Sequence, residues 1–116
     1  MDSKSYHIAV NFFQRYIYLY QGYNLLNSYP IGIGRAATPA PVGEYLVTKK
    51  NINPPLATFG TRSIHLSNTT TCIHGTNNPS SIGRSVSDGC ISMHNKDIEE
   101  LFELVEIGTR VIIFLD

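Results

Sequence analysis

The sequence predicts a mainly β protein, a β-sandwich with two short helices. Short segments rich in β-branched and aromatic residues recur along the chain, and glycines, asparagines and prolines separate them. Helix signals are confined to two short segments in the second half of the chain. With 116 residues, the chain is long enough for one compact hydrophobic core but not for two. We therefore expect a single domain over residues 1–116.

The first part of the chain predicts a β-meander. Strand-like segments run from Tyr6 to Val10, from Arg15 to Tyr20 and from Leu25 to Ile33, and Gln21-Gly22 and Tyr23-Asn24 break them. Prolines then punctuate the middle of the chain, where they limit strand length. Further strands are expected at Glu44–Thr48, Ser63–Ser67, Thr71–His74 and Arg110–Leu115.

Two short helices are expected late in the chain. Asn78 as N-cap with Pro79 at the first helical position predicts a brief helix that continues to Ser87. Asn95 is expected to cap a longer helix through Val105. Apolar residues recur on that second segment at helical spacing and should pack on a sheet, namely Ile98, Leu101, Phe102 and Val105.

Composition excludes several classes of function. Hydrophobic residues make up 42% of the chain and charged residues 16%, and nine basic residues balance nine acidic ones. This balance gives no indication of nucleic-acid binding. The start of the chain lacks both a continuous apolar segment and a small-residue cleavage site, and no later stretch approaches the roughly 20 apolar residues of a membrane span. We expect neither a signal peptide nor a transmembrane segment in this chain.

The segment from Cys72 to Asn95 contains the residues of a thiol enzyme. A cysteine attacks a carbonyl carbon as the thiolate, so it needs a base or a positive dipole nearby and N–H donors for the developing oxyanion. Cys90 follows Gly89, and His74 lies sixteen positions earlier. A glycine beside the nucleophile lets the backbone turn sharply, so we expect the amides of Asp88, Gly89 and Cys90 to converge as an oxyanion hole.

These residues resemble the signature of bacterial L,D-transpeptidase catalytic domains of the YkuD type. The resemblance rests on His74-Gly75-Thr76-Asn77-Asn78-Pro79, Ser87-Asp88-Gly89-Cys90-Ile91 and Met93-His94-Asn95-Lys96-Asp97, with Thr38-Pro39, Gly43-Glu44-Tyr45 and Phe59-Gly60-Thr61-Arg62 upstream. It covers essentially the whole chain. It implies a β-sandwich of mixed sheets whose two short helices lie beside the active site.

The resemblance also implies a mechanism. Cys90 is the expected nucleophile and His74 its general base, with the carbonyl of Gly75 orienting the imidazole and the backbone of Asp88 and Gly89 stabilising the oxyanion. The family reaction is acyl transfer on peptidoglycan stem peptides. D-alanine leaves, a thioester forms, and an amine or water then attacks it, so an L,D-carboxypeptidase side activity is expected. Carbapenems acylate the same cysteine in the family, and no cofactor or metal is implied.

Substrate contacts and location follow from the same resemblance. Candidate substrate-binding residues are Arg84, Asn77, Thr76, Ser87 and Ser92. The residue types of Thr76, Asn77 and Asn78 favour turn formers whose side chains bond to the local backbone, in a loop that would border the cleft. The expected location is the cell wall or another extracytoplasmic site, with the spore as one such place.

Two residues depart from the family pattern. Asp88 occupies a position where the family most often has histidine, and an anion beside a thiolate raises the pKa of that thiol. We expect lower activity or a higher pH optimum as a result. Ser92 stands where the family usually has arginine or asparagine, and it offers one hydrogen-bond donor and no charge.

Other interpretations stay open at this point. Cys72 shares a strand face with His74, where it fills space, forms a reversible disulfide with Cys90, or joins a zinc site with His74, Cys90 and His94. The last case predicts a zinc-stapled binding module. A catalytically degenerate domain that binds peptidoglycan without turning it over is a further alternative. His65 is expected to face either the cleft or water.

Overall fold

The structure is a computed structural model, and it describes residues 6–33, 42–55, 59–68, 71–83 and 91–115. These residues form eight strands, one α-helix and one turn of 3-10 helix. The strands are β1 (Tyr6–Asn11), β2 (Tyr16–Gln21), β3 (Asn24–Ile33), β4 (Gly43–Ile52), β5 (Arg62–Leu66), β6 (Cys72–His74), β7 (Ile91–Met93) and β8 (Arg110–Phe114). The 3-10 turn is η3 (Pro79–Ser81), and the helix is α1 (Asn95–Leu104).

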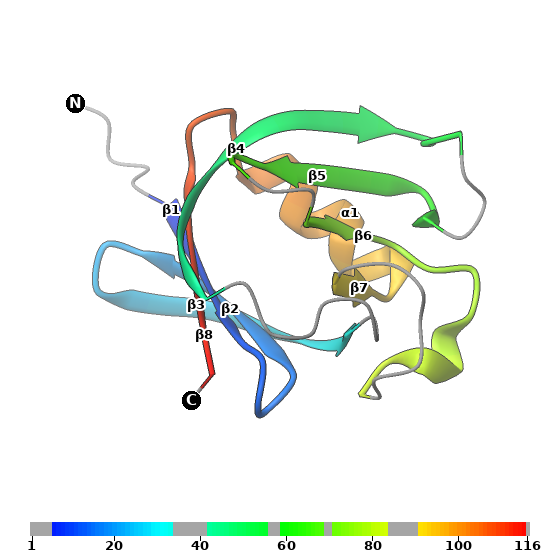
Figure 1. Cartoon of the computed structure of the whole chain (residues 1–116), viewed down its shortest axis with the longest axis horizontal. Coiled ribbons are helices and arrows are strands. Elements are labelled where there is room, and N and C mark those ends of the chain that lie inside the picture. The colour runs from blue at the N-terminus through cyan, green and yellow to red at the C-terminus, as the bar shows by residue number, and fades with distance from the viewer. Residues whose placement is uncertain (1–5, 34–41, 56–58, 69–70, 84–90, 116) are drawn as a thin grey trace.

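The strands close into a flattened barrel in the order β1-β2-β3-β7-β6-β5-β4-β8 (Figure 1). Two long strands join its two sheets. In β3, residues 24–30 pair with β2 and residues 31–33 with β7, while β4 pairs first with β8 and then with β5. The pairs β1–β8 and β6–β7 are parallel and the others are antiparallel. The predicted sandwich of mixed sheets is confirmed in this form.

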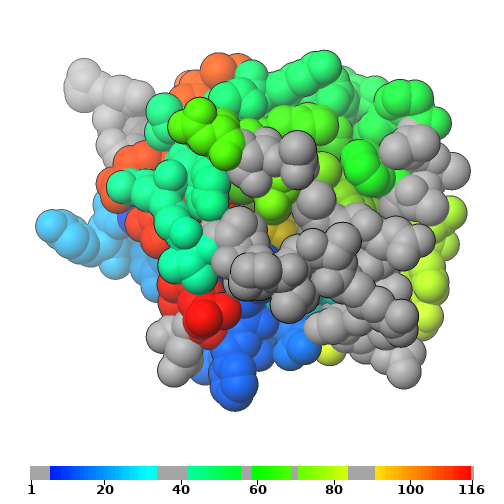
Figure 2. Space-filling view, viewed as in Figure 1, coloured from blue at the N-terminus to red at the C-terminus, as the bar shows by residue number. Residues whose placement is uncertain are grey.

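The core lies between the two sheets and follows the two-residue alternation of the strands. Ile8 and Val10 of β1 point inward, and they alternate with His7 and Ala9, which remain partly exposed. On the second sheet Ile64, Ile73 and Ile91 are fully buried. Each such aliphatic side chain stabilises the fold by roughly 1.5–3 kcal/mol relative to its exposed state. In Figure 2 the turn between β2 and β3 projects from the body of the molecule, and Tyr23 on it is fully exposed.

Helix α1 packs against β5 and completes the core (Figure 1). Its buried residues are the ones that the helical spacing predicts, Ile98, Leu101 and Phe102, and Val105 follows them into the core. The helix ends at Leu104, one residue earlier than expected, because Val105 has an extended backbone with φ −93° and ψ 157°. The N–H of Val105 still donates to the carbonyl of Leu101.

Two details of the helix prediction are wrong. The N-cap position of α1 is His94, without a capping side-chain bond, and Asn95 is the first helical residue. The brief helix at Pro79 is a single 3-10 turn, because the chain becomes extended at Ile82, where φ is −66° and ψ is 134°. Residues 84–87, to which that helix was expected to run, lie outside the described residues.

The strand predictions are confirmed in position, with two differences. Strand β4 continues to Ile52, four residues beyond the expected end, because it crosses from one sheet to the other. Strand β7 was not predicted. It has three residues, which is too short for alternation to be visible in the sequence, and its partners β3 and β6 come from distant parts of the chain.

Candidate active site

The candidate site lies on the side of the β5–β6–β7 sheet opposite the core. Ser63 of β5 is paired with His74 of β6, and His74 is paired with Ser92 of β7. Their neighbours Ile64, Ile73 and Ile91 belong to the core cluster, so alternation turns the three polar side chains to the other face. Ser63 and Ser92 are fully buried, and His74 is 2% exposed. The predicted base is therefore screened from solvent.

The hydrogen bonding of His74 fixes its tautomer. Its Nδ1 lies 2.5 Å from the carbonyl oxygen of Gly75. Because a carbonyl can only accept, Nδ1 carries the hydrogen and the neutral ring keeps its lone pair on Nε2. Nε2 is buried and has no hydrogen-bond partner among the described residues. The imidazole of His74 therefore has one basic nitrogen, Nε2, that no described residue occupies with a hydrogen bond.

Burial lowers the pKa of His74 below its ordinary value of 6.5. The bond to Gly75 opposes this shift, and the charge of His65 adds to it. Desolvation disfavours the imidazolium, so the ring is neutral at pH 7. A neutral imidazole with a free lone pair is the form that accepts a proton from a thiol.

The Phe59-Gly60-Thr61-Arg62 segment holds this histidine in place. The ring of Phe59 stacks on the imidazole of His74, with centroids 4.3 Å apart and planes at 5°. The carbonyl of Arg62 accepts a bond from the Gly75 N–H over 3.0 Å. The sequence motif that supported the resemblance therefore covers and orients the predicted base.

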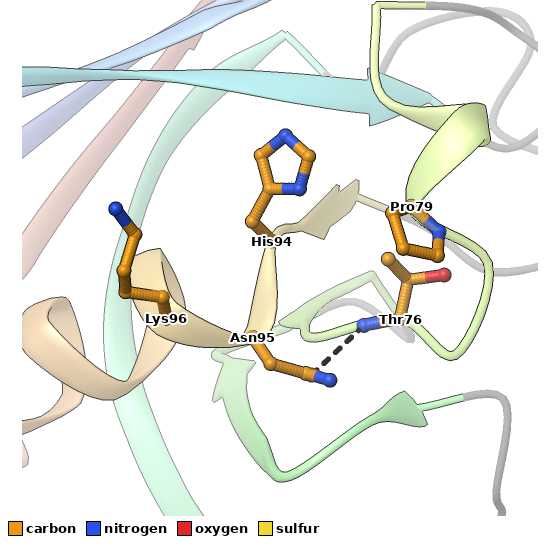
Figure 3. A pocket seen from close by; sticks show the side chains of 5 residues that line it. All are labelled: Thr76, Pro79, His94, Asn95 and Lys96. Atoms are coloured by element: carbon orange, nitrogen blue, oxygen red, sulfur yellow. Dashed lines mark hydrogen bonds between the residues drawn. The ribbon is translucent and has the colours of Figure 1, made fainter.

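Asn95 connects that segment to the loop after β6. Its Oδ1 accepts one bond from the Thr61 N–H and one from the Thr76 N–H, each 3.2 Å long. Figure 3 shows the Asn95 side chain directed from the start of α1 toward the backbone of Thr76. This close approach needs Gly60, whose φ is +65° and at which a Cβ would lie 2.5 Å from the Thr76 nitrogen. The expected capping role of Asn95 is thus replaced by a bridge between two loops.

The loop after His74 is a turn stabilised by its own side chains. The hydroxyl of Thr76 accepts a bond from the Asn78 N–H at 2.9 Å and donates to the Asn78 carbonyl at 3.3 Å. This confirms Thr76 as a turn former, and Asn77 beside it is exposed. A pocket of about 450 Å³ opens here and is lined by Thr76, Pro79, His94, Asn95 and Lys96 (Figure 3).

Comparison with known proteins identifies the fold and its family. The model of the L,D-transpeptidase catalytic domain, YkuD, matches residues 5–113. The chain belongs to the L,D-transpeptidase catalytic domain family. It is 46% identical over 110 residues to the YkuD protein of Bacillus licheniformis and 44% identical over 108 residues to that of Bacillus subtilis. These alignments cover 95% and 93% of the chain but 66% and 65% of the two relatives, so the chain spans just under two thirds of their length.

A solved L,D-transpeptidase, LdtMt1 in complex with imipenem, has the same fold. It superposes with a TM-score of 0.77 at 16% identity, and the match covers 95% of this chain and 59% of that one. The likeness to an L,D-transpeptidase domain in the YkuD family, inferred from the motifs, is confirmed by these matches.

Several predicted site residues fall outside the described part of the L,D-transpeptidase domain. They are Cys90, Gly89, Asp88, Ser87 and Arg84. Among the predicted residues that the structure does describe, His74 and Ser92 are paired on neighbouring strands, and Gly75 follows His74 directly. The hydroxyl of Ser92 is buried and has no hydrogen-bond partner among the described residues. Because Ser92 is paired with His74, the neighbouring strands carry two such buried polar atoms, Nε2 of His74 and Oγ of Ser92.

Cys72 is buried in this L,D-transpeptidase domain. It is directly paired with His65, on the same sheet face as His74. Within the part of the chain that the structure describes, no group of three histidine, cysteine or acidic side chains could hold a metal ion. Because Cys90 lies outside that part, the zinc interpretation and the disulfide remain predictions.

No helix in the described ranges combines the length and the apolar character that a membrane span requires.

His65 is the residue that the sequence left undecided. It lies on the same sheet face as Ser63 and His74, and its Nε2 is 3.2 Å from Nδ2 of Asn51. Sequence reasoning missed Asn51 and Phe59 as individual contributors to the site. Phe59 had a signal, because it begins a motif of the family, whereas nothing in the sequence marks Asn51.

Proposed function

We propose that this chain is the catalytic domain of a peptidoglycan L,D-transpeptidase that uses Cys90 as nucleophile and His74 as general base. The observation that carries the proposal is the state of His74, a buried neutral imidazole held through Nδ1 by the Gly75 carbonyl, with Nε2 unpartnered among the described residues. The chain connection supports the proposed pairing of Cys90 with His74. Ile91 is paired with Ile73, the residue before His74, and Cys90 directly precedes Ile91 in the sequence. Because consecutive Cα atoms are about 3.8 Å apart, the covalent chain keeps Cys90 within one residue of the strand next to β6.

The reaction begins with proton transfer from the Cys90 thiol to Nε2 of His74. The sulfur attacks the carbonyl carbon that joins the L-centre of a stem-peptide diamino acid to the terminal D-alanine, and the backbone N–H groups of Asp88 and Gly89 stabilise the oxyanion. The tetrahedral intermediate collapses, the C–N bond breaks, and the D-alanine amine leaves with the proton that His74 held. A thioester remains on Cys90.

The second half of the reaction releases the acyl group. An amine of another stem peptide, deprotonated by His74, attacks the thioester and gives a cross-link, or water attacks and gives the carboxypeptidase product. The substrate lies in the bacterial wall, so the domain acts outside the cytoplasm. The proposed substrate contacts are Arg84, Asn77, Thr76, Ser87 and Ser92.

Acylation by a carbapenem tests the nucleophile. The protein, its Cys90→Ala variant and its Cys72→Ala variant are incubated with imipenem, and intact mass is recorded under reducing conditions. We expect an adduct on the parent and on Cys72→Ala but none on Cys90→Ala. Equal labelling of parent and Cys90→Ala, or no labelling of any protein, would contradict the proposal.

Release of D-alanine from a stem tetrapeptide separates an enzyme from a degenerate binding domain. The parent should release D-alanine and Cys90→Ala should not, while both should bind the peptide. Binding without release by the parent would favour the degenerate domain. Zinc in freshly purified protein at one ion per chain would favour the zinc-stapled module.

A further inference from the structure

A second pocket lies beside His74 on the outer face of the sheet. Its volume is about 270 Å³, and its described lining residues are Lys49, Asn51, Pro54, Pro55, Phe59, Ser63 and His65. We call it the Lys49 pocket. The loop containing Pro54 and Pro55 and the ring of Phe59 form an apolar wall, and the polar side chains come from β4 and β5.

The Lys49 pocket adjoins the proposed base. Phe59 lines the pocket and stacks on the His74 ring at 4.3 Å. Ser63 also lines it and is the residue of β5 directly paired with His74. A group bound in this pocket would therefore lie one side chain away from the imidazole.

Hydrogen bonds join the polar groups of β4 and β5 in the pocket and fix the tautomer of His65. Nδ2 of Asn51 lies 3.2 Å from the Ser63 hydroxyl oxygen and 3.2 Å from Nε2 of His65. Because an amide nitrogen only donates, Nε2 of His65 accepts, and its hydrogen is on Nδ1. Lys49 adds an ammonium group with three donors. Its charge also lowers the pKa of His65, after the larger effect of burial, so the two groups are close enough to interact.

No carboxylate is among the described residues that line this pocket, so the ammonium of Lys49 has no acidic partner there. A pocket with the ammonium of Lys49, the Nδ1–H of His65 and one apolar wall matches a carboxylate whose neighbouring carbon atoms are apolar. A cationic amine would be repelled by Lys49, which makes the acceptor amine a poor occupant.

We propose that the Lys49 pocket is a subsite that binds a carboxylate of the stem peptide, through the ammonium of Lys49 and the Nδ1–H of His65. This rests on the proposed function, because the ligand is the substrate of that reaction. Two carboxylates of a stem peptide are chemically suitable, the one on the terminal D-alanine and the one on the side chain of the diamino acid, where it has one.

Binding to a protein that cannot turn over the peptide tests the subsite. Cys90→Ala protein is titrated with a synthetic tetrapeptide that has both carboxylates, with its C-terminal carboxamide, and with its side-chain amide. The imidazole resonances of His65 and His74 report binding in NMR spectra. The same titrations use Lys49→Met in this background and, as a matched control, Lys96→Met, which removes an equal charge from the other pocket.

We expect one of the two amides to bind roughly fivefold more weakly than the parent peptide, since the Lys49 side chain is exposed and such ion pairs are screened. The amide that weakens binding identifies the carboxylate. The difference should vanish in Lys49→Met and persist in Lys96→Met. Equal affinity of all three peptides, a difference that survives Lys49→Met, or an unshifted His65 resonance would each overturn the proposal.

Failure of the subsite and failure of the proposed enzyme activity give different results. D-alanine release by the unmodified protein without any effect of amidation would remove the subsite and leave the transpeptidase. An amidation effect that depends on Lys49, together with no release of D-alanine, would keep the subsite and remove the transpeptidase.

Discussion

Replacement of Asn95 by alanine should loosen the candidate active site and destabilise the fold. The change removes the acceptor that holds the Thr61 and Thr76 N–H groups at 3.2 Å each. A net loss of about 1 kcal/mol per partly buried bond gives about 2 kcal/mol in the free energy of unfolding. Alanine's better helix propensity returns a few tenths of this. At about 2.1 cal/mol/K per residue, the remaining loss of about 1.7 kcal/mol corresponds to a fall of about 7 °C in Tm for a chain of 116 residues.

Asn95→Asp is the matched control for this prediction. Aspartate keeps the acceptor oxygen, and its charge is favourable in the first turn of α1, by roughly 0.3–1 kcal/mol. Both variants and the parent are compared by urea unfolding and by their rates of imipenem acylation. We expect Asn95→Asp to match the parent, and Asn95→Ala to be less stable and slower, because the loop with Phe59 is no longer tied to the loop with Thr76. Alanine within about 0.5 kcal/mol of the parent, or aspartate as damaging as alanine, would refute the role of the shared acceptor.

Three further predictions concern the surroundings of His74. Phe59→Ala should admit water to the imidazole of His74 and raise its pKa toward 6.5, so the acidic limb of the kcat/KM profile should move to higher pH. An NMR titration of His74 measures this pKa, with Phe59→Leu as the control that keeps an apolar cover. An unchanged titration in Phe59→Ala would contradict the prediction. Gly60→Ala should lose at least about 1 kcal/mol more than Gly22→Ala, because both have positive φ but only Gly60 has backbone atoms within 3.0 Å of the new Cβ. The unfolded chain protonates His74 near pH 6.5, while the fold keeps the ring neutral, so the free energy of unfolding should decrease below that pH until the folded ring also protonates. Chemical denaturation at pH 5 and pH 8 measures this decrease, and it should be smaller in His74→Gln than in the parent.

Local sequence patterns predicted most of the fold. Segments rich in β-branched and aromatic residues located β1, β2, β5 and β8, and the four-residue helical spacing of Ile98 and Phe102 identified the buried face of α1. Strand β7 could not be predicted, because three residues show no period and its pairing depends on β3 and β6, which are distant in sequence.

The candidate site was predicted through residue identity and not through its contacts. The pairing of His74 with the Gly75 carbonyl followed from the family resemblance and is present in the structure. Asn95 was misassigned because an asparagine before an apolar periodic segment is a common N-cap signal. Its actual partners, Thr61 and Thr76, are 34 and 19 residues away, and no local rule connects them.

The environment of the proposed thiol and imidazole favours a neutral pair in the resting protein. Burial lowers the pKa of His74, and the orienting group is a carbonyl, which stabilises an imidazolium less than a carboxylate would. Asp88, two positions before Cys90 in the sequence, is expected to disfavour a thiolate as well. In the proposed mechanism, both effects would keep the proton on sulfur until a carbonyl carbon is in place. The Cys90 thiol would then become a nucleophile only as His74 accepts its proton, so the proposal predicts reactivity toward substrates that reach both residues together.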